Sequence, residues 1–273
     1  MKFLEFLEKE MPTPGNYGWF HILSLVLIIG AIAALIVFAR DASDKKFRRI
    51  VLITWIIMLA FEIYKQIIYT FRVSDGTLEI SYQWYAFPFQ FCSSPLYVLP
   101  FIALLKEGKV RNAFMAFAST FMLFGGLAVM FYPNDVFCPT IGINIQTMIH
   151  HGFQLGMGVY IAVYNRKKLS IKFMWPAVIV FACFAVVAIV FNEIGHAALP
   201  DHTINMFFIS RHYACTLPVL STFYGDPANP MVPYPAFLII YLVGFCLVAL
   251  IMYTFEWLLI VKTTNKNAKF YQA

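Results

Sequence analysis

Runs of about twenty apolar residues, separated by short polar segments, dominate the chain. A helix needs about 20 apolar residues to cross the hydrocarbon core of a bilayer. The ten-residue alternation that is typical of a membrane β-barrel does not occur. The pattern therefore predicts an all-α fold, a polytopic transmembrane helical bundle. Its seven spans are expected near residues 19–39, 50–71, 85–105, 113–132, 141–164, 173–192 and 234–261.

One long segment, between Gly195 and Pro233, fits this scheme less simply. It is partly apolar but contains Arg211, His212 and Pro218. We expect a re-entrant or interfacial element before the last span. An eighth span would place the basic C-terminal tail on the opposite side from the other basic loops, so seven is the better count.

The basic residues predict the orientation in the membrane. Four polar segments, at 40–49, 106–112, 165–172 and 262–273, hold 15 of the 20 Lys and Arg residues. Basic loops stay in the cytoplasm. We therefore expect the N-terminus outside and the C-terminus inside. The expected organisation is an amphipathic lead-in (1–18), one helical membrane domain (19–261) and a cytoplasmic basic tail (262–273).

The amino-acid composition indicates where the protein is located and which kinds of partner it has. The chain is 61% hydrophobic and only 12% charged, against about 25% charged residues in a soluble domain. Its net charge of +6 follows from the membrane loops and does not indicate nucleic acid. We expect a multi-pass protein of the cell membrane whose partners are membrane lipids and a lipid or small-molecule substrate. No cofactor is predicted, a disulfide between Cys138 and Cys215 is left open, and so is the oligomeric state.

Polar residues inside the second predicted span are the first functional candidates. Glu62, Lys65, Gln66 and Tyr69 follow one another at offsets that place them on one helix face. Ionisable residues within a membrane are costly and often functional. Glu62 and Lys65 could form a buried pair, which would either lock the helix to its neighbours or serve a substrate.

Two further spans carry candidate chemistry. In the third, prolines at 88 and 95 flank Cys92 and interrupt the helix, which membrane proteins tolerate only against protein or a water-filled cavity. In the fifth, a stripe is formed by Asn144, Thr147, His151 and Gln154, with Gln146 and His150 on the adjacent face. Cys92 could be a packing residue, and the histidines could be structural.

The depths of these groups link the three spans. At 1.5 Å per residue, Cys92, Glu62 and the two histidines lie about 12, 13 and 15 Å from the outer ends of their helices. Asn205, Arg211 and His212 follow in the long outer segment. We infer a polar cavity in the outer half of the bundle.

Several short patterns resemble the YwaF-like family of bacterial integral membrane proteins. They are Glu62, Phe-Pro-Phe-Gln-Phe-Cys at 87–92, Gly-Gly at 125–126 before Tyr-Pro at 132–133, His-Gly at 151–152, Asn205 with Met-Phe-Phe, and Pro-Tyr-Pro at 233–235. Vertebrate relatives of that family are described as acyltransferases that remodel ether phospholipids. The resemblance implies Cys92 as the acyl-accepting nucleophile and His151 as its base. Gln90 departs from the family pattern, which has histidine there.

Three functions remain open from the sequence. The first is a phospholipid acyltransferase or lipid hydrolase with Cys92, His151 and an oxyanion donor such as Gln90. The second is a transporter or substrate-binding membrane protein that uses the same cavity. For either, the expected substrate-binding residues are Glu62, Lys65, Gln66, Gln90, Asn144, His150, Gln154, Asn205 and Arg211. A metal-dependent hydrolase would draw its ligands from Glu193, His196, Asp201, His202 and His212, but the chain lacks the H-E-x-x-H motif.

Overall fold

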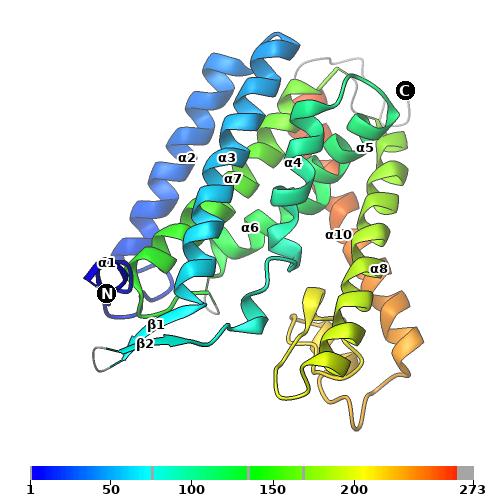
Figure 1. The fold of residues 1–273 in the computed structure, drawn as a ribbon. Helices are drawn as coiled ribbons and strands as arrows, with labels where there is room; N and C mark the ends of the chain where they lie inside the picture. The colour runs from blue at the N-terminus through cyan, green and yellow to red at the C-terminus, as the bar shows by residue number, and fades with distance from the viewer. Residues whose placement is uncertain (1, 75–76, 134–135, 168–169, 263–273) are drawn as a thin grey trace.

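The computed structural model describes residues 2–74, 77–133, 136–167 and 170–262, and its main body is a bundle of long helices (Figure 1). Each of the seven predicted spans corresponds to a helix. They are α2 (Trp19–Ala39), α3 (Asp44–Ile68), α4 (Ser94–Leu104), α5 (Lys109–Phe117) with α6 (Leu123–Phe131), α7 (Ile141–Tyr164), α8 (Met174–Ala198) and α10 (Tyr234–Glu256). Segments with π-helical hydrogen bonds connect α5 to α6 (Ala118–Met122) and extend α10 (Trp257–Val261).

The helices differ in how well they suit a membrane. Within the described residues, five helical stretches are long and apolar enough to cross one: Trp19–Ala39, Asp44–Ile68, Lys109–Phe131, Ile171–Ala198 and Tyr234–Ile260. Phe91–Leu104 is a shorter apolar helix, and α7 has 24 residues but a polar stripe. These findings confirm an all-α, multi-pass membrane protein. Seven crossings and the outside N-terminus remain predictions.

The polar helix α7 lies among the other helices, where α2, α3 and α6 contact it. Glycines allow these contacts to be close. A Cβ atom at Gly126 of α6 would lie 2.5 Å from the backbone nitrogen of Leu155. One at Gly152 would lie 2.2 Å from Ile28, and one at Gly156 would lie 3.1 Å from Ile32. Gly152 and Gly156 therefore allow α7 to pack closely against α2.

The basic loops gather at one end of the bundle. Arg166 donates a hydrogen bond to the carbonyl of Arg40, and Arg48 donates to those of Ala103 and Leu104. The buried Arg111 pairs with Asp44. Three of the four segments that the charge pattern assigns to one side therefore meet in space, while most of the fourth (263–273) lies outside the described residues.

The opposite end carries α1 (Lys2–Leu7) and a hairpin of antiparallel strands β1 (Phe71–Ser74) and β2 (Thr77–Ile80) (Figure 1). The sequence pattern did not predict this hairpin, and α3 ends at Ile68 rather than Phe71 because the chain turns into it. The long segment after α8 contains only a 3₁₀ turn (Met206–Phe208) and the short α9 (Leu220–Tyr224). The prediction that this segment is not a plain spanning helix is confirmed.

The third predicted span starts later than expected, at Ser94 instead of Tyr85. A 3₁₀ turn (Trp84–Ala86) precedes an extended stretch at Phe87, and a second 3₁₀ turn (Phe91–Ser93) leads into α4. Proline at 88 pushes the residue before it into extended geometry. Pro95 then occupies the start of α4, where its missing N–H costs nothing. Cys92 therefore lies in a turn just before a short helix.

Candidate functional site

Cys92 and His150 are in direct contact through the backbone. Nε2 of His150, on α7, lies 2.9 Å from the carbonyl oxygen of Cys92. Cys92 is a half-buried residue that forms no disulfide, whereas His150 is 3% exposed. The contact joins the polar face of α7 to the interrupted segment before α4. It was the neighbouring His151 that the family resemblance assigned as the base.

Hydrogen bonds to carbonyl oxygens fix the tautomers of both histidines. A carbonyl only accepts, so Nε2 of His150 must carry the proton that it donates to Cys92. In the same way, Nδ1 of His151 donates to the Thr147 carbonyl at 2.8 Å. The other ring nitrogens, Nδ1 of His150 and Nε2 of His151, are buried and have no hydrogen-bond partner in the described parts of the chain. In neutral imidazoles both are lone-pair acceptors.

The two imidazole rings stand 5.4 Å apart, centroid to centroid, in an edge-on arrangement. A buried polar atom without a partner is rare in proteins and calls for an explanation. Two such proton acceptors side by side form a site that can take a proton from a thiol or a substrate. The approach of the His151 ring to the Cys92 thiol itself remains a prediction.

A buried ion pair supplies charge beside these groups. Nζ of Lys65 lies 2.8 Å from Oε1 of Glu62, which confirms the pair that the sequence pattern suggested. Glu62 is 4% exposed, so it faces the bundle interior. The charge of Lys65 acts on Cys92, His150 and His151. These four residues and Glu62 therefore form one electrostatic cluster, which we call the Cys92 cluster.

Gln66 connects the Cys92 cluster to the segment 82–86, which follows the β1–β2 hairpin. Its amide nitrogen donates to Oε1 of Glu62 and to the carbonyl of Ala86, and its amide oxygen accepts from the hydroxyl of Tyr82. Oε2 of Glu62 has no partner among the described residues. The predicted placement of Gln66 beside Glu62 is thus observed, and a carboxylate oxygen remains for a ligand.

Gln154 lies one turn along α7 from the histidines. It is fully buried, and neither amide atom has a hydrogen-bond partner in the part of the chain that the structure describes. Its amide nitrogen and the ring of Phe91 both face Gly125, where a Cβ would come within 2.6 and 2.9 Å of them. Gln154 thus lies close to the residue that precedes Cys92, with unused hydrogen-bonding capacity.

Three other predicted site residues form hydrogen bonds with backbone groups instead. Gln90 donates to the Asn205 carbonyl and accepts from the Phe207 N–H. Asn205 bonds to the backbone of Ala214 and Ser210, and Asn144 bonds to both the N–H and the carbonyl of Cys138. Gln90 and Asn205 stabilise a strained turn, in which Phe207 and Phe208 have positive φ angles. We therefore assign these amides structural roles.

Arg211 belongs to a separate group, which joins the long segment after α8 to the end of α8. It lies 2.7 Å from Glu193, which also accepts from His212, and His212 stacks on His196 at 3.6 Å between centroids. No group of three or more His, Cys, Asp or Glu side chains in the described ranges has an arrangement that could hold a metal ion. The ligand set of a metal-dependent hydrolase is therefore not assembled among these residues.

The sequence patterns missed two buried polar residues. His21, fully buried at the start of α2, bonds to the Met130 carbonyl at 2.8 Å and accepts from the Tyr17 N–H, so it is a structural link. Glu256 of α10 is 4% exposed, and its two carboxyl oxygens have no partner within the described residues. An acidic residue within the apolar run 234–261 was the signal that could have identified it.

A family model described as the TMEM164 family matches residues 16–253, which include every residue of the Cys92 cluster. No curated protein matches the chain. No solved structure matches it either.

Proposed function

Because the chain belongs to the TMEM164 family, a family of membrane proteins, we propose that it acts on membrane phospholipids as an acyltransferase. Cys92 is the acyl-accepting nucleophile, and the histidine pair His150 and His151 supplies the base. The likeness to YwaF-like proteins, which implies an acyltransferase, stays a resemblance. We expect the protein in the cell membrane, with the Cys92 cluster in the outer half of the bundle.

One observation carries this proposal. Two buried histidines hold tautomers that leave Nδ1 of His150 and Nε2 of His151 as unpartnered proton acceptors, and one of them is bonded to the Cys92 backbone. A thiol becomes a good nucleophile when a base takes its proton and a cation stabilises the thiolate. The histidines supply the first requirement and Lys65 the second.

The reaction takes two steps. An imidazole takes the thiol proton, and Sγ of Cys92 attacks the carbonyl carbon of a phospholipid ester. The S–C bond forms, the C–O bond breaks, and the leaving oxygen receives the proton from the imidazolium. In the second step the hydroxyl oxygen of a lysophospholipid attacks the thioester carbonyl carbon and its proton passes to the imidazole. The new C–O bond forms, the C–S bond breaks, and the imidazolium returns the proton to Sγ of Cys92. Water in place of the lysophospholipid would make the protein a hydrolase.

The buried polar groups can bind the substrate around this reaction. Lys65 can attract the phosphate of a headgroup, and the free oxygen of Glu62 can accept a hydrogen bond from an ammonium or hydroxyl group. Gln154 can donate to the developing oxyanion, a role for which the sequence had suggested Gln90. The amide of Gln90 already bonds to the backbone at Asn205 and Phe207, so Gln154 is the better candidate.

Purified protein in nanodiscs tests the proposal. The nanodiscs contain a phosphatidylcholine with an isotope-labelled acyl chain and an unlabelled lysophospholipid. We expect label to reach the acceptor lipid, and a hydroxylamine-sensitive acyl group on the Cys92 peptide in mass spectrometry. Cys92→Ser should abolish both, whereas the matched change Cys246→Ser in α10 should preserve them. Transfer that survives Cys92→Ser would rule out this mechanism.

One observation favours transport as the second candidate. The helix α4 has 11 residues and follows an interrupted backbone at 84–93, and discontinuous helices mark the binding sites of many transporters. The Glu62–Lys65 pair and the histidines would then bind a small molecule or carry protons. Uptake into proteoliposomes that persists in Cys92→Ser but disappears in Glu62→Gln would favour this function.

A further inference from the structure

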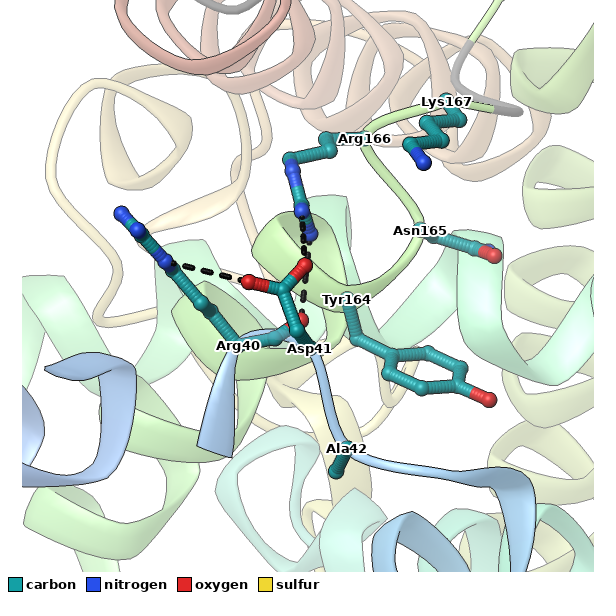
Figure 2. A pocket seen from close by; sticks show the side chains of 7 residues that line it. All are labelled: Arg40, Asp41, Ala42, Tyr164, Asn165, Arg166 and Lys167. Carbon is teal, nitrogen blue, oxygen red and sulfur yellow. Dashed lines mark hydrogen bonds and ion pairs between the residues drawn. The ribbon is translucent and has the colours of Figure 1, made fainter. Parts of the chain in front are cut away.

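A second site lies at the basic end of the bundle, away from the Cys92 cluster. The turn 40–42, which follows α2, and the turn 164–167, which ends α7, enclose an open pocket of ≈ 270 Å³ (Figure 2). Three cations line it, Arg40, Arg166 and Lys167, with Asp41 as the one acidic residue of the lining. The lining therefore carries a net charge of about +2 at neutral pH.

Asp41 offsets only one of the three positive charges. It pairs with both Arg40 and Arg166, and chiefly the hydrogen bond from Arg166 holds the pKa of the Asp41 carboxyl below its ordinary value. Asp41 is therefore ionised at neutral pH and neutralises one of the two arginines. The second arginine and Lys167 remain as positive charge.

Arg166 builds the pocket. Its side chain is 13% exposed. It donates to the carbonyls of Arg40 and Val163 and to Asp41. These bonds fix the end of α7 against the end of α2 and leave the guanidinium little capacity for a ligand.

Arg40 and Lys167 are the free donors. The Arg40 guanidinium uses only Nε, toward Asp41, and within the described ranges the ammonium of Lys167 makes no hydrogen bond. Figure 2 shows these two side chains on either side of the Asp41–Arg166 pair. A guanidinium has five N–H donors and an ammonium has three. With the Arg40 Nε–H used by Asp41, four donors of Arg40 and three of Lys167 are open to an anion.

We propose that this pocket binds the phosphate group of an anionic phospholipid. The position favours a lipid source. Arg40 follows α2 directly, and α2 exposes most of its apolar side chains along its length, including Val37 and Phe38 in its last turn. A lipid whose acyl chains lie along α2 would carry its headgroup at the level of Arg40 and Lys167. Basic residues at this level attract anionic headgroups.

The test measures anionic lipid bound to purified protein. The protein is reconstituted in nanodiscs of phosphatidylcholine with a minor fraction of phosphatidylglycerol, then extracted, and the retained lipids are counted by native mass spectrometry. We expect the double change Arg40→Gln with Lys167→Gln to lower phosphatidylglycerol affinity about tenfold or more. The matched control Arg49→Gln with Lys109→Gln removes two exposed charges at the same end, outside the pocket, and should stay within about twofold.

A variant that is expected to strengthen lipid binding separates a loss of binding from a loss of folding. Asp41→Asn removes the acidic group among the described lining residues and should strengthen phosphatidylglycerol binding, which a misfolded protein would not do. Inorganic phosphate in nanodiscs of phosphatidylcholine alone distinguishes the source. If it protects the protein against heat as well as phosphatidylglycerol does, the pocket binds phosphate from solution. Equal losses in the pocket and control doubles, or an unchanged Asp41→Asn variant, would overturn the proposal.

Discussion

The imidazole of His150 holds the backbone of Cys92, with Nε2 at 2.9 Å from the carbonyl oxygen, while its Nδ1 stays without a partner among the described residues. One side chain thus performs two separable tasks. It positions the segment before α4, and it offers a lone pair beside a thiol. Substitutions that keep one task and remove the other can distinguish a structural histidine from a base.

The first prediction uses that separation. His150→Gln keeps an N–H donor for the Cys92 carbonyl but has no basic nitrogen. We expect thermal stability close to that of the natural protein, and labelling of Cys92 by a lipophilic maleimide slowed about tenfold, since the thiolate is the reactive form. His151→Ala should slow labelling as well, by less, because it is His150 that bonds to the backbone of Cys92.

Labelling is followed by mass spectrometry of the Cys92 peptide, with Cys183 in α8 as the internal control. Cys183 is exposed on a plain apolar helix, so its rate should not respond to either substitution. If the labelling rate of Cys92 is the same in both histidine variants as in the natural protein, neither histidine activates the thiol. The site would then be a binding or transport site.

The second prediction concerns the buried pair. Glu62→Gln leaves Lys65 without its partner inside the bundle, and removing one member of a buried pair costs roughly 3 kcal/mol. Replacing both, as Glu62→Gln with Lys65→Met, should recover most of this loss, because no buried charge remains. Unfolding in detergent reports the free energies, and Glu79→Gln on the exposed strand β2 should change stability by less than about 0.5 kcal/mol. A double variant less stable than the single would show that the pair is not the source of the loss.

The third prediction tests the contact between α6 and α7. A Cβ at Gly126 would lie 2.5 Å from the backbone nitrogen of Leu155. A backbone atom cannot move aside as a side chain can. Gly126→Ala should therefore separate the two helices and cost about 1–3 kcal/mol. Gly30→Ala in α2 is the matched control, because a Cβ there meets nothing within 4 Å. It should be neutral or stabilising by about 0.5–1 kcal/mol. Equal effects of the two changes on the melting temperature would contradict the close approach.

The helices followed from the sequence because a span is a local property. Twenty apolar residues in a row are enough to predict one, and the start and end of α2 and α7 agree with the pattern to the residue. The hairpin at 71–80 was missed because it packs at the end of the bundle, beside α1, and its eight residues carry no long apolar run. The prolines at 88 and 95 indicated the interruption of α4 but not its extent.

The pairing of polar residues was only partly predictable, and distance along the chain explains the difference. Glu62, Lys65 and Gln66 lie within two turns of one helix, so their association followed from helical geometry. Gln90 bonds to residues more than 100 positions away, and nothing in its own surroundings specifies them. His150 was placed beside Cys92 only as a matter of depth. Which of two adjacent histidines makes the contact depends on the rotation of α7, which its neighbours set.

The fourth prediction concerns orientation, which the bundle alone does not define. Arg166, Arg40, Arg48 and Arg111 gather at one end, and the positive-inside rule places that end in the cytoplasm. Cysteines are introduced singly at Ser43, which is exposed at the basic end, and at Ala228, which is exposed at the other. The background lacks the five native cysteines. In intact cells a membrane-impermeant maleimide should label Ala228→Cys, whereas Ser43→Cys should react only after permeabilisation. Labelling of Ser43→Cys in intact cells would show that the orientation is the opposite one. The Cys92 cluster would then take its lipid from the inner leaflet.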